Sequence, residues 1–571
     1  MTLFSSRAKE SAVLVSLLLL CTAAAGRAQT ASEQALACRP FVPAGSDYEF
    51  ARGSRELPQD AQALRFGEVH LTRLSIFDES DPGEDIPLFR WANDFHILTR
   101  PQVIRQQLLF SEGQEFDARL LAETARLLRQ QAYFHDADVR AVSVCDEAVD
   151  IEVISKDNWS LTPSLSFDRQ GGENSYSVGL RDSNFLGYGK LLALSDGKDI
   201  DRHSSELMYQ DHNLFGSRLR ADVHFQNSND GDSRAASLDL PFYSLDSRRA
   251  WALRLLDEER LDTQYFRSEE ISEVRHHEEM AVAEIGFSGG LINGWARRWQ
   301  LGLQYQEDRY RPGSELPSPA DLPRDRRLVY PFATLEIIED DYVTAFNLDQ
   351  IYRTEDLHLG RQLRLRAGYA AEGLGSDQDR LVFGGHYSNS LHYDDDSLWQ
   401  HQADWEGFYN VSSSALENVL LSYRNRYFRR QTAQRSFFAQ LEAVYSKNLD
   451  SHRQVVLGGQ TGARAYENRF QVGDSRVLLT LEERLYSDIH LLNLIRLGGA
   501  VFVDVGRAWS DDADTGSSED WLADIGFGLR LASSKAASDR IAHLDFAFPL
   551  SNQSDPAVDS VLISFTVKGS F

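Results

Sequence analysis

Apolar and polar residues alternate along most of the chain after residue 156, a two-residue period that is typical of β-strands with chemically different faces. The clearest example is the last segment, whose apolar face ends on the terminal aromatic residue. That face comprises Val561, Ile563, Phe565, Val567 and Phe571. The other face is hydroxylic or charged, and segments 524–531 and 543–550 repeat the pattern. The sequence therefore predicts consecutive β-strands with one apolar and one polar side.

Residues 157–571 show no helical periodicity, and turns rich in Gly, Asn, Asp and Ser separate their strand-like segments. A soluble β-sandwich would show the same alternation. A terminal strand that ends in an aromatic residue, and more than 400 residues with one type of pattern, favour a transmembrane β-barrel instead. At roughly 26 residues for each strand and its connection, this length predicts about 16 antiparallel strands, an even number as in bacterial barrels.

The N-terminal residues 1–28 have the organisation of a secretory signal peptide, with Arg7 and Lys9 before an apolar run at 12–20 and small residues up to Ala28. The apolar run is too short to anchor the chain in a membrane. No other segment has about 18 consecutive apolar residues, which excludes a helical membrane protein. The mean hydropathy of −0.40 suits a barrel, because only one face of each strand must be apolar. We therefore expect an exported protein of the outer membrane.

Residues 63–156 combine helical and strand patterns, whereas residues 29–62 have no assignment. Strand-like runs are predicted at 64–77, 139–145 and 149–154. Two helices are indicated between the first and second runs, one opening at Thr99 and Pro101 and the other capped by Asp117. This β-α-α-β-β order predicts a small α+β domain in front of the barrel.

The chain carries 86 acidic and 59 basic residues, and its net charge of −27 argues against a nucleic-acid partner, which would need clustered Lys and Arg. Acidic residues concentrate in short polar runs between strand-like segments, at 227–232, 339–341, 394–396 and 511–520. We interpret these runs as solvated loops. A divalent-cation site is the alternative, although no run has complete EF-hand spacing.

Three cysteines are present, and Cys21 would leave with the signal peptide. Cys38 and Cys145 would remain in a compartment that we expect to be oxidising. They can form a disulfide if their Cα atoms lie close enough, and otherwise remain free thiols.

Short motifs in residues 63–156 add a family resemblance to the pattern. Together with the β-α-α-β-β order, the runs 99–104 (TRPQVI), 111–116 (SEGQEF) and 127–134 (LLRQQAYF) resemble a POTRA domain. POTRA domains are the periplasmic modules of BamA/TamA-type outer-membrane assembly factors. The resemblance implies that this domain lies in the periplasm and binds client polypeptides.

Motifs in the barrel half resemble the same superfamily. Residues 181–189 (RDSNFLGYG) and, in part, 211–216 (DHNLFG) are similar to the turn after the first barrel strand. Residues 458–466 (GGQTGARAY) resemble the family's inward-folded sixth extracellular loop, with Arg464 at the position of its signature arginine and Tyr466 two residues later. The family usually has Gly where this chain has Ala465, and Gly often serves backbone angles that a β-carbon disfavours.

Residues 501–506 (VFVDVG) resemble the strand of the family that receives this arginine. Alternation tests the match independently, because the three valines can only face lipid. Phe502, Asp504 and Gly506 must then point into the lumen. The acidic residue is therefore on the side that an arginine in the lumen can reach.

Glu482 also points inward by alternation and matches a second acidic position of the family, while Glu483 faces outward and would have to lie at the membrane rim. The resemblance and the facing together predict that Arg464 is held between inward carboxylates by charge-assisted hydrogen bonds, which would fix the loop inside the barrel. An ordinary polar lumen with scattered charges is the alternative.

Patterns for catalysis and metal binding are weak. Residues 286–290 (GFSGG) match the nucleophile-elbow pattern, but that motif needs a strand-to-helix turn and both flanks are strand-like. The 15 histidines show no metal-ligand spacing such as H-E-x-x-H, and we expect His276 and His277, next to Glu278, to be solvated. The sequence thus predicts no enzyme, no cofactor and no metal site.

The resemblance implies an outer-membrane factor that inserts or exports unfolded outer-membrane or secreted polypeptides, with membrane lipids and accessory periplasmic proteins as further partners. A client would pair with a strand edge of the periplasmic domain. The barrel would part its first and last strands, near 159–167 and 561–571, because an unpaired edge implies a use for it. Two other hypotheses remain, a passive diffusion pore and an outer-membrane hydrolase that uses Ser288.

Overall fold

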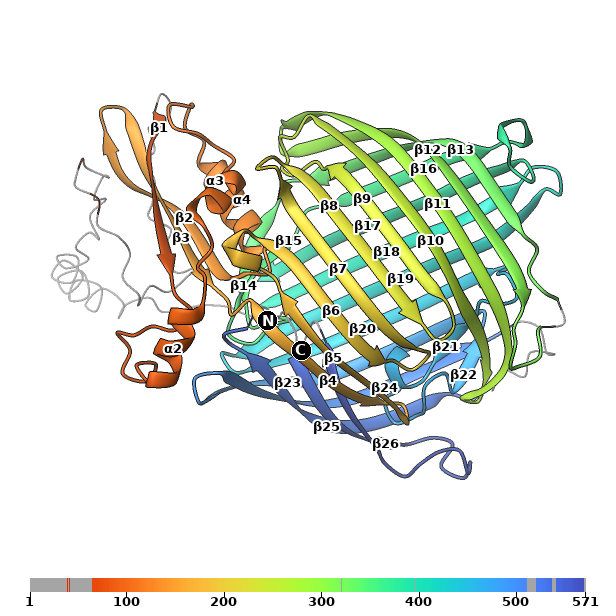
Figure 1. The fold of residues 1–571 in the computed structure, drawn as a ribbon. Helices are drawn as coiled ribbons and strands as arrows, with labels where there is room; N and C mark the ends of the chain where they lie inside the picture. Colours follow the sequence, from red (N-terminus) through yellow and green to blue (C-terminus); the bar gives the residue numbers. More distant parts are fainter. Residues whose placement is uncertain are drawn as a thin grey trace, which may run out of the picture.

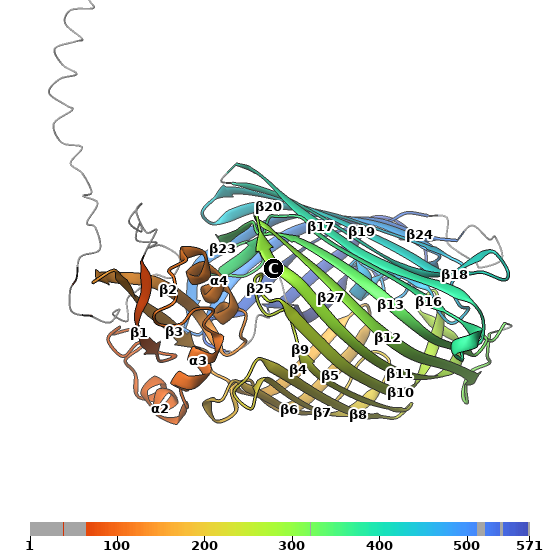
Figure 2. The same cartoon turned by 90° about the horizontal axis from the view of Figure 1, so that it is seen from above.

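The structure is a computed structural model that describes Cys38, Phe41 and residues 64–319, 321–394, 396–510, 520–536 and 541–568. The predicted signal peptide, nearly all of residues 29–62 and the terminal Phe571 lie outside the described residues. Two units follow one another along the chain, a small α+β domain and a large barrel, with the domain at one end of the barrel (Figures 1 and 2). We call this end of the barrel proximal and the opposite end distal.

The small domain has a three-stranded sheet in the order β1-β3-β2, with β1 parallel and β2 antiparallel to β3. Its elements are β1 (Arg65–Leu74), α2 (Pro87–Phe95), α3 (Pro101–Gln107), α4 (Ala118–Arg129), β2 (Phe134–Cys145) and β3 (Ala148–Asp157). Asp117 caps α4 by accepting a hydrogen bond of 2.9 Å from the Arg119 amide, as its position before the helix predicts. Apolar residues of α3, α4 and the sheet form one buried core, centred on Phe66, Leu128 and Ile151. The helix α2 is an addition to the predicted β-α-α-β-β order.

A closed barrel of 20 strands follows. Its strands are β4 (Leu161–Gln170), β5 (Glu173–Asp182), β6 (Lys190–Lys198), β7 (His203–Leu214), β8 (Leu219–Ser228), β9 (Asp232–Leu240), β10 (Arg249–Phe266), β11 (Glu269–Ile292), β12 (Trp295–Pro312), β13 (Arg326–Glu339), β16 (Gln362–Ala370), β17 (Arg380–Asp394), β18 (Ser397–Asn410), β19 (Ala415–Thr432), β20 (Arg435–Lys447), β23 (Ser475–Leu491), β24 (Ile495–Trp509), β25 (Leu522–Ser533), β26 (Ile541–Pro549) and β27 (Leu562–Lys568).

The prediction of about 16 strands was therefore wrong. It assumed connections of ordinary length, whereas many of the turns are very short. β10 and β11 are joined by Arg267 and Ser268 alone, and β11 and β12 by Asn293 and Gly294. These four turn residues have positive φ, as a two-residue hairpin requires, so little of the chain is spent between strands.

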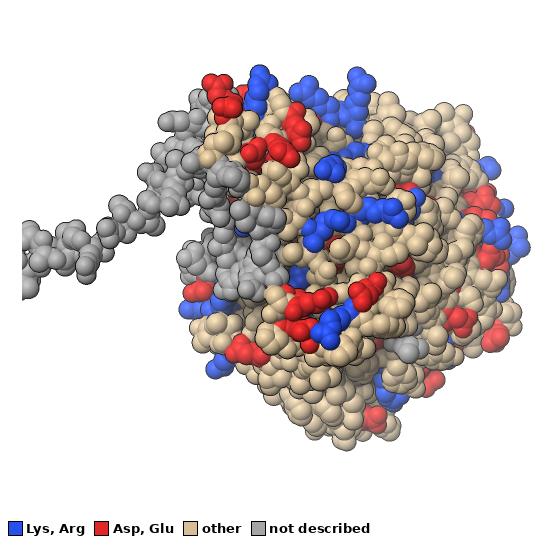
Figure 3. All heavy atoms as spheres, turned by 60° about the vertical axis from the view of Figure 1, so that its left-hand side comes forward, with Lys and Arg blue, Asp and Glu red and all other residues tan. Residues whose placement is uncertain are grey.

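Side chains alternate between the two faces of the wall. Exposed apolar residues such as Ile285, Leu303, Val501 and Phe527 cover the outside, while charged and polar residues are buried on the inside. On the face that Figure 3 shows, uncharged residues form most of the surface and the charges lie in small groups of both signs. None of the helices in the described part of the chain is long and apolar enough to cross a membrane.

Among the described residues, two connections contain a pair of strands of their own. At the proximal end, the segment between β13 and β16 forms a hairpin of β14 (Tyr342–Phe346) and β15 (Thr354–His358). At the distal end, the connection between β20 and β23 contains β21 (Val455–Leu457) and β22 (Gln471–Gly473). We call residues 340–361, which connect β13 and β16, the proximal hairpin. We call residues 448–474, which connect β20 and β23, the clamp loop.

The proximal hairpin joins the domain to the barrel. Arg129 of α4 donates to Asp356 at 2.8 Å, Thr354 donates to Asp136 at 2.8 Å, and Arg353 donates to the Phe134 carbonyl at 3.1 Å. Burial raises the pKa of the Asp136 carboxyl to about 6. Side-chain contacts therefore fix the position of the domain relative to the wall.

Candidate functional site

The barrel closes at a seam between its first strand, β4, and its last strand, β27. Across this seam, Arg169 of β4 lies opposite Phe565 of β27 in an antiparallel register. The neighbouring pairs of strands have full ladders, with seven paired residues between β26 and β27 and ten between β4 and β5. The described residues of β27 end at Lys568, so the rest of this seam lies outside the part of the chain that the structure describes.

Residues of the predicted C-terminal signal lie on β27 with the expected facing. Phe565 and Val567 are half-buried, and they alternate with the buried Leu562, Ser564 and Thr566. Phe571, the third predicted residue, lies outside the described residues. The described part of β27 therefore presents one apolar side outward next to the seam.

The clamp loop contacts the β4 side of the seam at the distal end. Asn468 donates from its backbone to the Gly171 carbonyl at 3.0 Å and from its side chain to the Gln170 carbonyl at 2.7 Å. The Gln170 side chain in turn donates to the Gly459 carbonyl at 3.1 Å. Because Gln170 ends β4 and Gly171 begins the β4–β5 turn, these contacts fix the tip of the first strand.

The same loop contacts the β27 side. The Tyr466 hydroxyl oxygen lies 2.9 Å from the Ala523 carbonyl oxygen and 2.8 Å from the Ser551 hydroxyl oxygen. Ser551 belongs to the connection between β26 and β27, and Ala523 to β25. The clamp loop therefore spans the distal end of the seam from one side to the other.

Arg464 fixes the clamp loop to the inside of the barrel wall. Its guanidinium donates to both carboxylate oxygens of Asp504 on β24, at 2.7 and 3.1 Å, and to Glu482 on β23 at 3.0 Å. The Phe502 ring lies against the guanidinium, 3.5 Å from the ring centre to the central carbon. Only 8% of the Arg464 side chain is exposed. Such a buried, bidentate and stacked arrangement suits arginine and not lysine.

Glycines set the path of the loop around Arg464. Gly458, Gly459 and Gly462 have positive φ, and a β-carbon at Gly462 would lie 2.1 Å from a Leu478 methyl group. Ala463 also has positive φ, whereas Ala465 does not. The alanine that replaces the family's usual glycine is thus at a position with ordinary backbone angles, and its amide donates to Asp524 at 3.2 Å.

Gly506 is the remaining predicted residue of this site. A β-carbon there would lie 2.9 Å from the Val477 carbonyl oxygen and 3.2 Å from a Leu457 methyl group. Leu457 is in β21 of the clamp loop, so the missing side chain lets the loop approach β24 closely. The six residues predicted around the loop therefore lie together, in a buried cluster of polar and apolar groups.

Three acidic or amide residues of the site were not singled out from the sequence. Asp524 accepts from Ala465, Asp545 lies 3.8 Å from the Arg464 guanidinium, and Asn468 holds the β4–β5 turn. The alternation of segments 524–531 and 543–550 places Asp524 and Asp545 on the polar, inward face. This facing was the signal in the sequence that could have identified them as site residues. Nothing in the local sequence indicates that Asn468 reaches the first strand, because that contact depends on the closed barrel.

The ion pairs continue from the clamp loop to the proximal end. Glu482 accepts from Arg464 through one oxygen and from Arg484 through the other, at 2.9 Å. Arg484 also donates to the Leu348 carbonyl of the proximal hairpin at 3.2 Å, and the Tyr486 hydroxyl donates to the same oxygen at 3.0 Å. A single strand, β23, thus connects the distal loop with the proximal hairpin.

The segment from β1 to α3 spans the proximal end of the seam. On the β27 side, Asn493 donates to the Gly83 carbonyl at 2.8 Å, and Lys535 pairs with Glu84 at 2.5 Å. On the β4 side, the Arg100 amide donates to the Gly187 carbonyl in the β5–β6 turn at 3.0 Å. The proximal end of the seam is therefore bridged by the small domain itself.

Other predicted residues take the following positions. Cys38 and Cys145 are joined in a disulfide with a Cα separation of 4.7 Å. Glu483 faces outward as expected and pairs with Arg435, which follows the proximal β19–β20 turn, at 2.8 Å.

The prediction that His276 is solvated was wrong, because its side chain is 5% exposed and lies between Asp262 and Asp308. The strand alternation of β11 turns it into the lumen, which the short motif alone does not reveal.

Comparison with known proteins gives weak likenesses. The chain matches no protein-family model and no curated protein sequence. Among solved structures it is similar to BamA from Haemophilus ducreyi lacking POTRA domains 1–3, at 12% identity and a TM-score of 0.40 over 88% of this chain and 84% of that chain. It is also similar to CdiB from Escherichia coli, at 13% identity and a TM-score of 0.45 over 88% of this chain and 76% of that chain.

A third similar structure is the FrpB iron transporter from Neisseria meningitidis, at 9% identity and a TM-score of 0.40 over 76% of this chain and 87% of that chain. Likenesses of this strength assign neither a family nor an activity to the chain. The functional argument rests on the geometry of the seam and of the contacts that span it.

Proposed function

We propose that this protein is an outer-membrane factor of the BamA/TamA type, which inserts or exports polypeptides through a barrel that opens between β4 and β27. The observation that carries the proposal is that side-chain and turn contacts span both ends of the seam between the first and the last strand. In the hydrocarbon of a membrane, each unsatisfied backbone group costs several kcal/mol, which is why barrel walls are normally paired throughout. Once parted, the edges of β4 and β27 would be suited to accept a strand from another polypeptide.

The small domain offers a second edge for a client. Strand β2 pairs with β3 on one side, and the described residues contribute no strand on its other side. The beginning of β2 contacts the proximal hairpin through Phe134 and Asp136. In this proposal the domain is periplasmic and delivers its client in strand form to the nearby barrel end.

The contacts across the two ends of the seam would hold the barrel shut between clients. The clamp loop spans the distal end and depends on Arg464, while the segment before α3 spans the proximal end. All of these contacts are made by side chains or turns. They can therefore be released without breaking the ladders of the remaining wall.

A pair of cysteines across the seam tests this proposal. Arg169→Cys with Phe565→Cys places two thiols on facing residues of β4 and β27, and Phe546→Cys with Ile563→Cys does the same within the full β26–β27 ladder as a control. Oxidation of the seam pair should abolish function and reduction should restore it, while the control pair stays active in both states. Full activity with the seam cross-linked would refute a lateral opening.

The activity itself is measured by comparing the outer-membrane and secreted proteomes of cells with and without the protein. Loss of a defined set of barrels or secreted proteins is the expected result. A passive pore predicts instead an unchanged proteome and a steady conductance of the purified barrel that does not depend on residues 29–156. The clamp loop and the proximal hairpin both lie across the lumen, which does not favour that alternative.

A further inference from the structure

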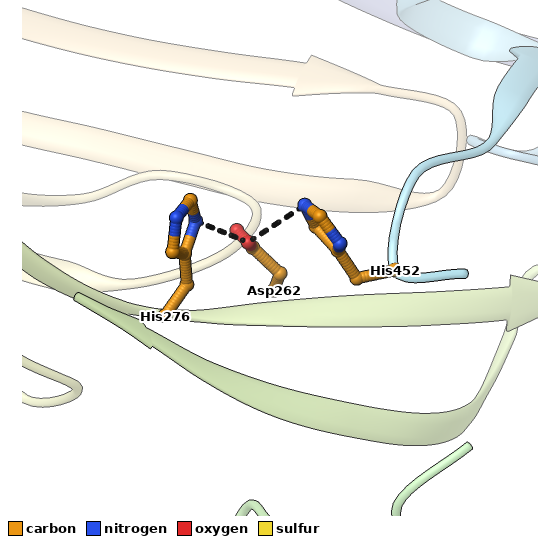
Figure 4. A group of neighbouring side chains, drawn as sticks. All are labelled: Asp262, His276 and His452. Carbon is orange, nitrogen blue, oxygen red and sulfur yellow. Dashed lines mark hydrogen bonds and ion pairs between the residues drawn. The ribbon is translucent and has the colours of Figure 1, made fainter. Parts of the chain in front are cut away.

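We propose a divalent metal site, of the kind that binds Zn²⁺, formed by Asp262, His276 and His452 in the distal part of the lumen. Asp262 is on β10 and His276 on β11, while His452 comes from the clamp loop (Figure 4). One ligand atom from each of the three side chains lies within 4.8 Å of the others. Two imidazole nitrogens and one carboxylate oxygen are ligands that zinc prefers, and three protein ligands leave one position for water.

The distances around Asp262 suit a shared ion. Its Oδ2 lies 3.1 Å from His276 Nδ1 and 3.7 Å from His452 Nε2. Ligand bonds of about 2.0–2.1 Å in a tetrahedral site separate neighbouring ligand atoms by roughly 3.3 Å. The three side chains therefore need only small movements to hold a common ion.

His452 gives independent support, because it is buried without ordinary hydrogen bonding. Its side chain is 7% exposed, and its Nδ1 has no hydrogen-bond partner among the described residues. The 3.7 Å from its Nε2 to Asp262 is too long for a hydrogen bond. A buried imidazole that faces a carboxylate at this distance is explained by a ligand between them.

The surroundings hold the other ligands as metal sites usually do. The second ring nitrogen of His276, Nε2, lies 3.1 Å from Asp308 Oδ1, and a histidine that donates there keeps Nδ1 as an acceptor for a metal. The other oxygen of Asp262, Oδ1, accepts from Arg260 Nε at 3.0 Å. Arg260 also lies 3.0 Å from His276 Nδ1, so the ion would take the place of that contact.

The clamp loop is positioned to present His452. Two residues further on, the Gln454 side chain exchanges two hydrogen bonds with the backbone of Tyr265 on β10, at 2.8 and 3.1 Å. Two residues earlier, Asp450 accepts from Arg326 on β13 at 2.9 Å. A cavity of about 740 Å³ adjoins the site and gives an ion a path from the lumen.

A metal at this place would connect the clamp loop to a second part of the wall. Arg464 fixes the loop to β23 and β24, whereas the metal would fix it to β10 and β11, on the other side of the lumen in strand order. The inference does not depend on what the barrel transports. It assigns to the loop a tether whose strength depends on the supply of a divalent cation.

The test uses the full mature chain in detergent, stripped with EDTA and titrated with Zn²⁺ by calorimetry. One equivalent per chain should bind, and His452→Ala, His276→Ala and Asp262→Asn should each weaken binding at least tenfold. Asp308→Asn should weaken it by about 10- to 100-fold through His276. His386→Ala, which removes a histidine paired with Asp404 at 2.6 Å, should leave the affinity unchanged.

Two further measurements keep the outcome clear. Absorption of bound Co²⁺ in the visible range should disappear in each ligand variant, and the heat-dependent mobility of the barrel in gels shows whether that variant is folded. Zn²⁺ should also slow amide exchange of residues 448–454 in the wild type but not in His452→Ala. No Zn²⁺ binding by the wild type, or binding that survives all three substitutions, would overturn the proposal. So would loss of binding in Glu278→Gln but not in His452→Ala, because the ion would then use the other side of His276.

Discussion

Replacement of Arg464 by alanine removes the only side chain that joins the clamp loop to both Asp504 and Glu482 within the described residues. The buried Asp504 carboxylate then keeps the Thr480 hydroxyl but loses its cationic partner, whereas Glu482 still pairs with Arg484. Removal of one member of a buried ion pair costs about 3–5 kcal/mol, since the remaining charge is left uncompensated. The bidentate geometry and the Phe502 contact place Arg464 in this class and not among surface pairs.

Amide hydrogen exchange of peptides from the clamp loop measures this loss directly. Local opening is governed by its own free energy, and about 1.4 kcal/mol corresponds to a factor of ten. A loss of about 3–5 kcal/mol thus predicts exchange that is roughly 10²- to 4 × 10³-fold faster around residues 458–470. Arg464→Lys keeps the charge but loses the bidentate contact, so its effect should be intermediate.

A matched control comes from the same loop. Arg469 pairs with Asp201 at 2.6 Å, but both side chains are more exposed, and a pair of this kind contributes about 0–1 kcal/mol. Arg469→Ala should therefore change exchange less than tenfold. Adding Asp504→Asn to Arg464→Ala should recover part of the loss, because it removes an unpaired charge. Equal exchange in Arg464→Ala and Arg469→Ala would refute the conclusion that Arg464 holds the loop.

Three other changes test separate parts of the structure. Burial, with the nearby Asp349, raises the pKa of the Glu355 carboxyl in the proximal hairpin to about 7, above its value of about 4.3 in an unfolded chain. The folded state then binds more protons, so stability should fall as pH rises from about 4.3 to 7, and Glu355→Gln should remove this fall from the melting temperature. Gly462→Ala should destabilise the clamp loop by about 1–3 kcal/mol through its backbone strain, measured by exchange, whereas Gly373→Ala, which has open space around it, should not. Cys38→Ser with Cys145→Ser removes a cross-link between residues 107 apart, which should lower the stability of the small domain by about 4 kcal/mol in denaturant unfolding. Cys145→Ser alone also removes the cross-link, and unchanged stability in that variant would contradict this prediction.

Alternation of side chains was the strongest source of correct prediction. It placed Phe502, Asp504 and Gly506 in the lumen and Glu483 on the outside, because a strand in a barrel wall has two environments and a period of two. The same rule holds whatever the strand number is. The number itself was missed, since chain length fixes only the sum of strands and turns, and two-residue hairpins such as Arg267–Ser268 leave room for more strands.

Contacts that depend on closure of the barrel could not be predicted. Asn468 and Gln170 are 298 positions apart, and His452 meets Asp262 only because the clamp loop folds inward. Helix α2 was also missed. Its apolar residues Leu88, Trp91 and Phe95 do recur at helical spacing, but they are exposed, and the segment just before the helix contacts a turn of the barrel through Gly83.

The seam has contacts at both of its ends in addition to the pairing of its strands. A ladder of seven to ten residue pairs joins each neighbouring pair of strands here, and each backbone hydrogen bond contributes about 0.5–1.5 kcal/mol. At the β4–β27 seam, side-chain contacts at the two ends add to the strand pairing. At the distal end these contacts come from the clamp loop through Asn468 and Tyr466. Since Arg464 fixes that loop, a change at one buried guanidinium should be felt at a seam to which the arginine itself makes no direct contact.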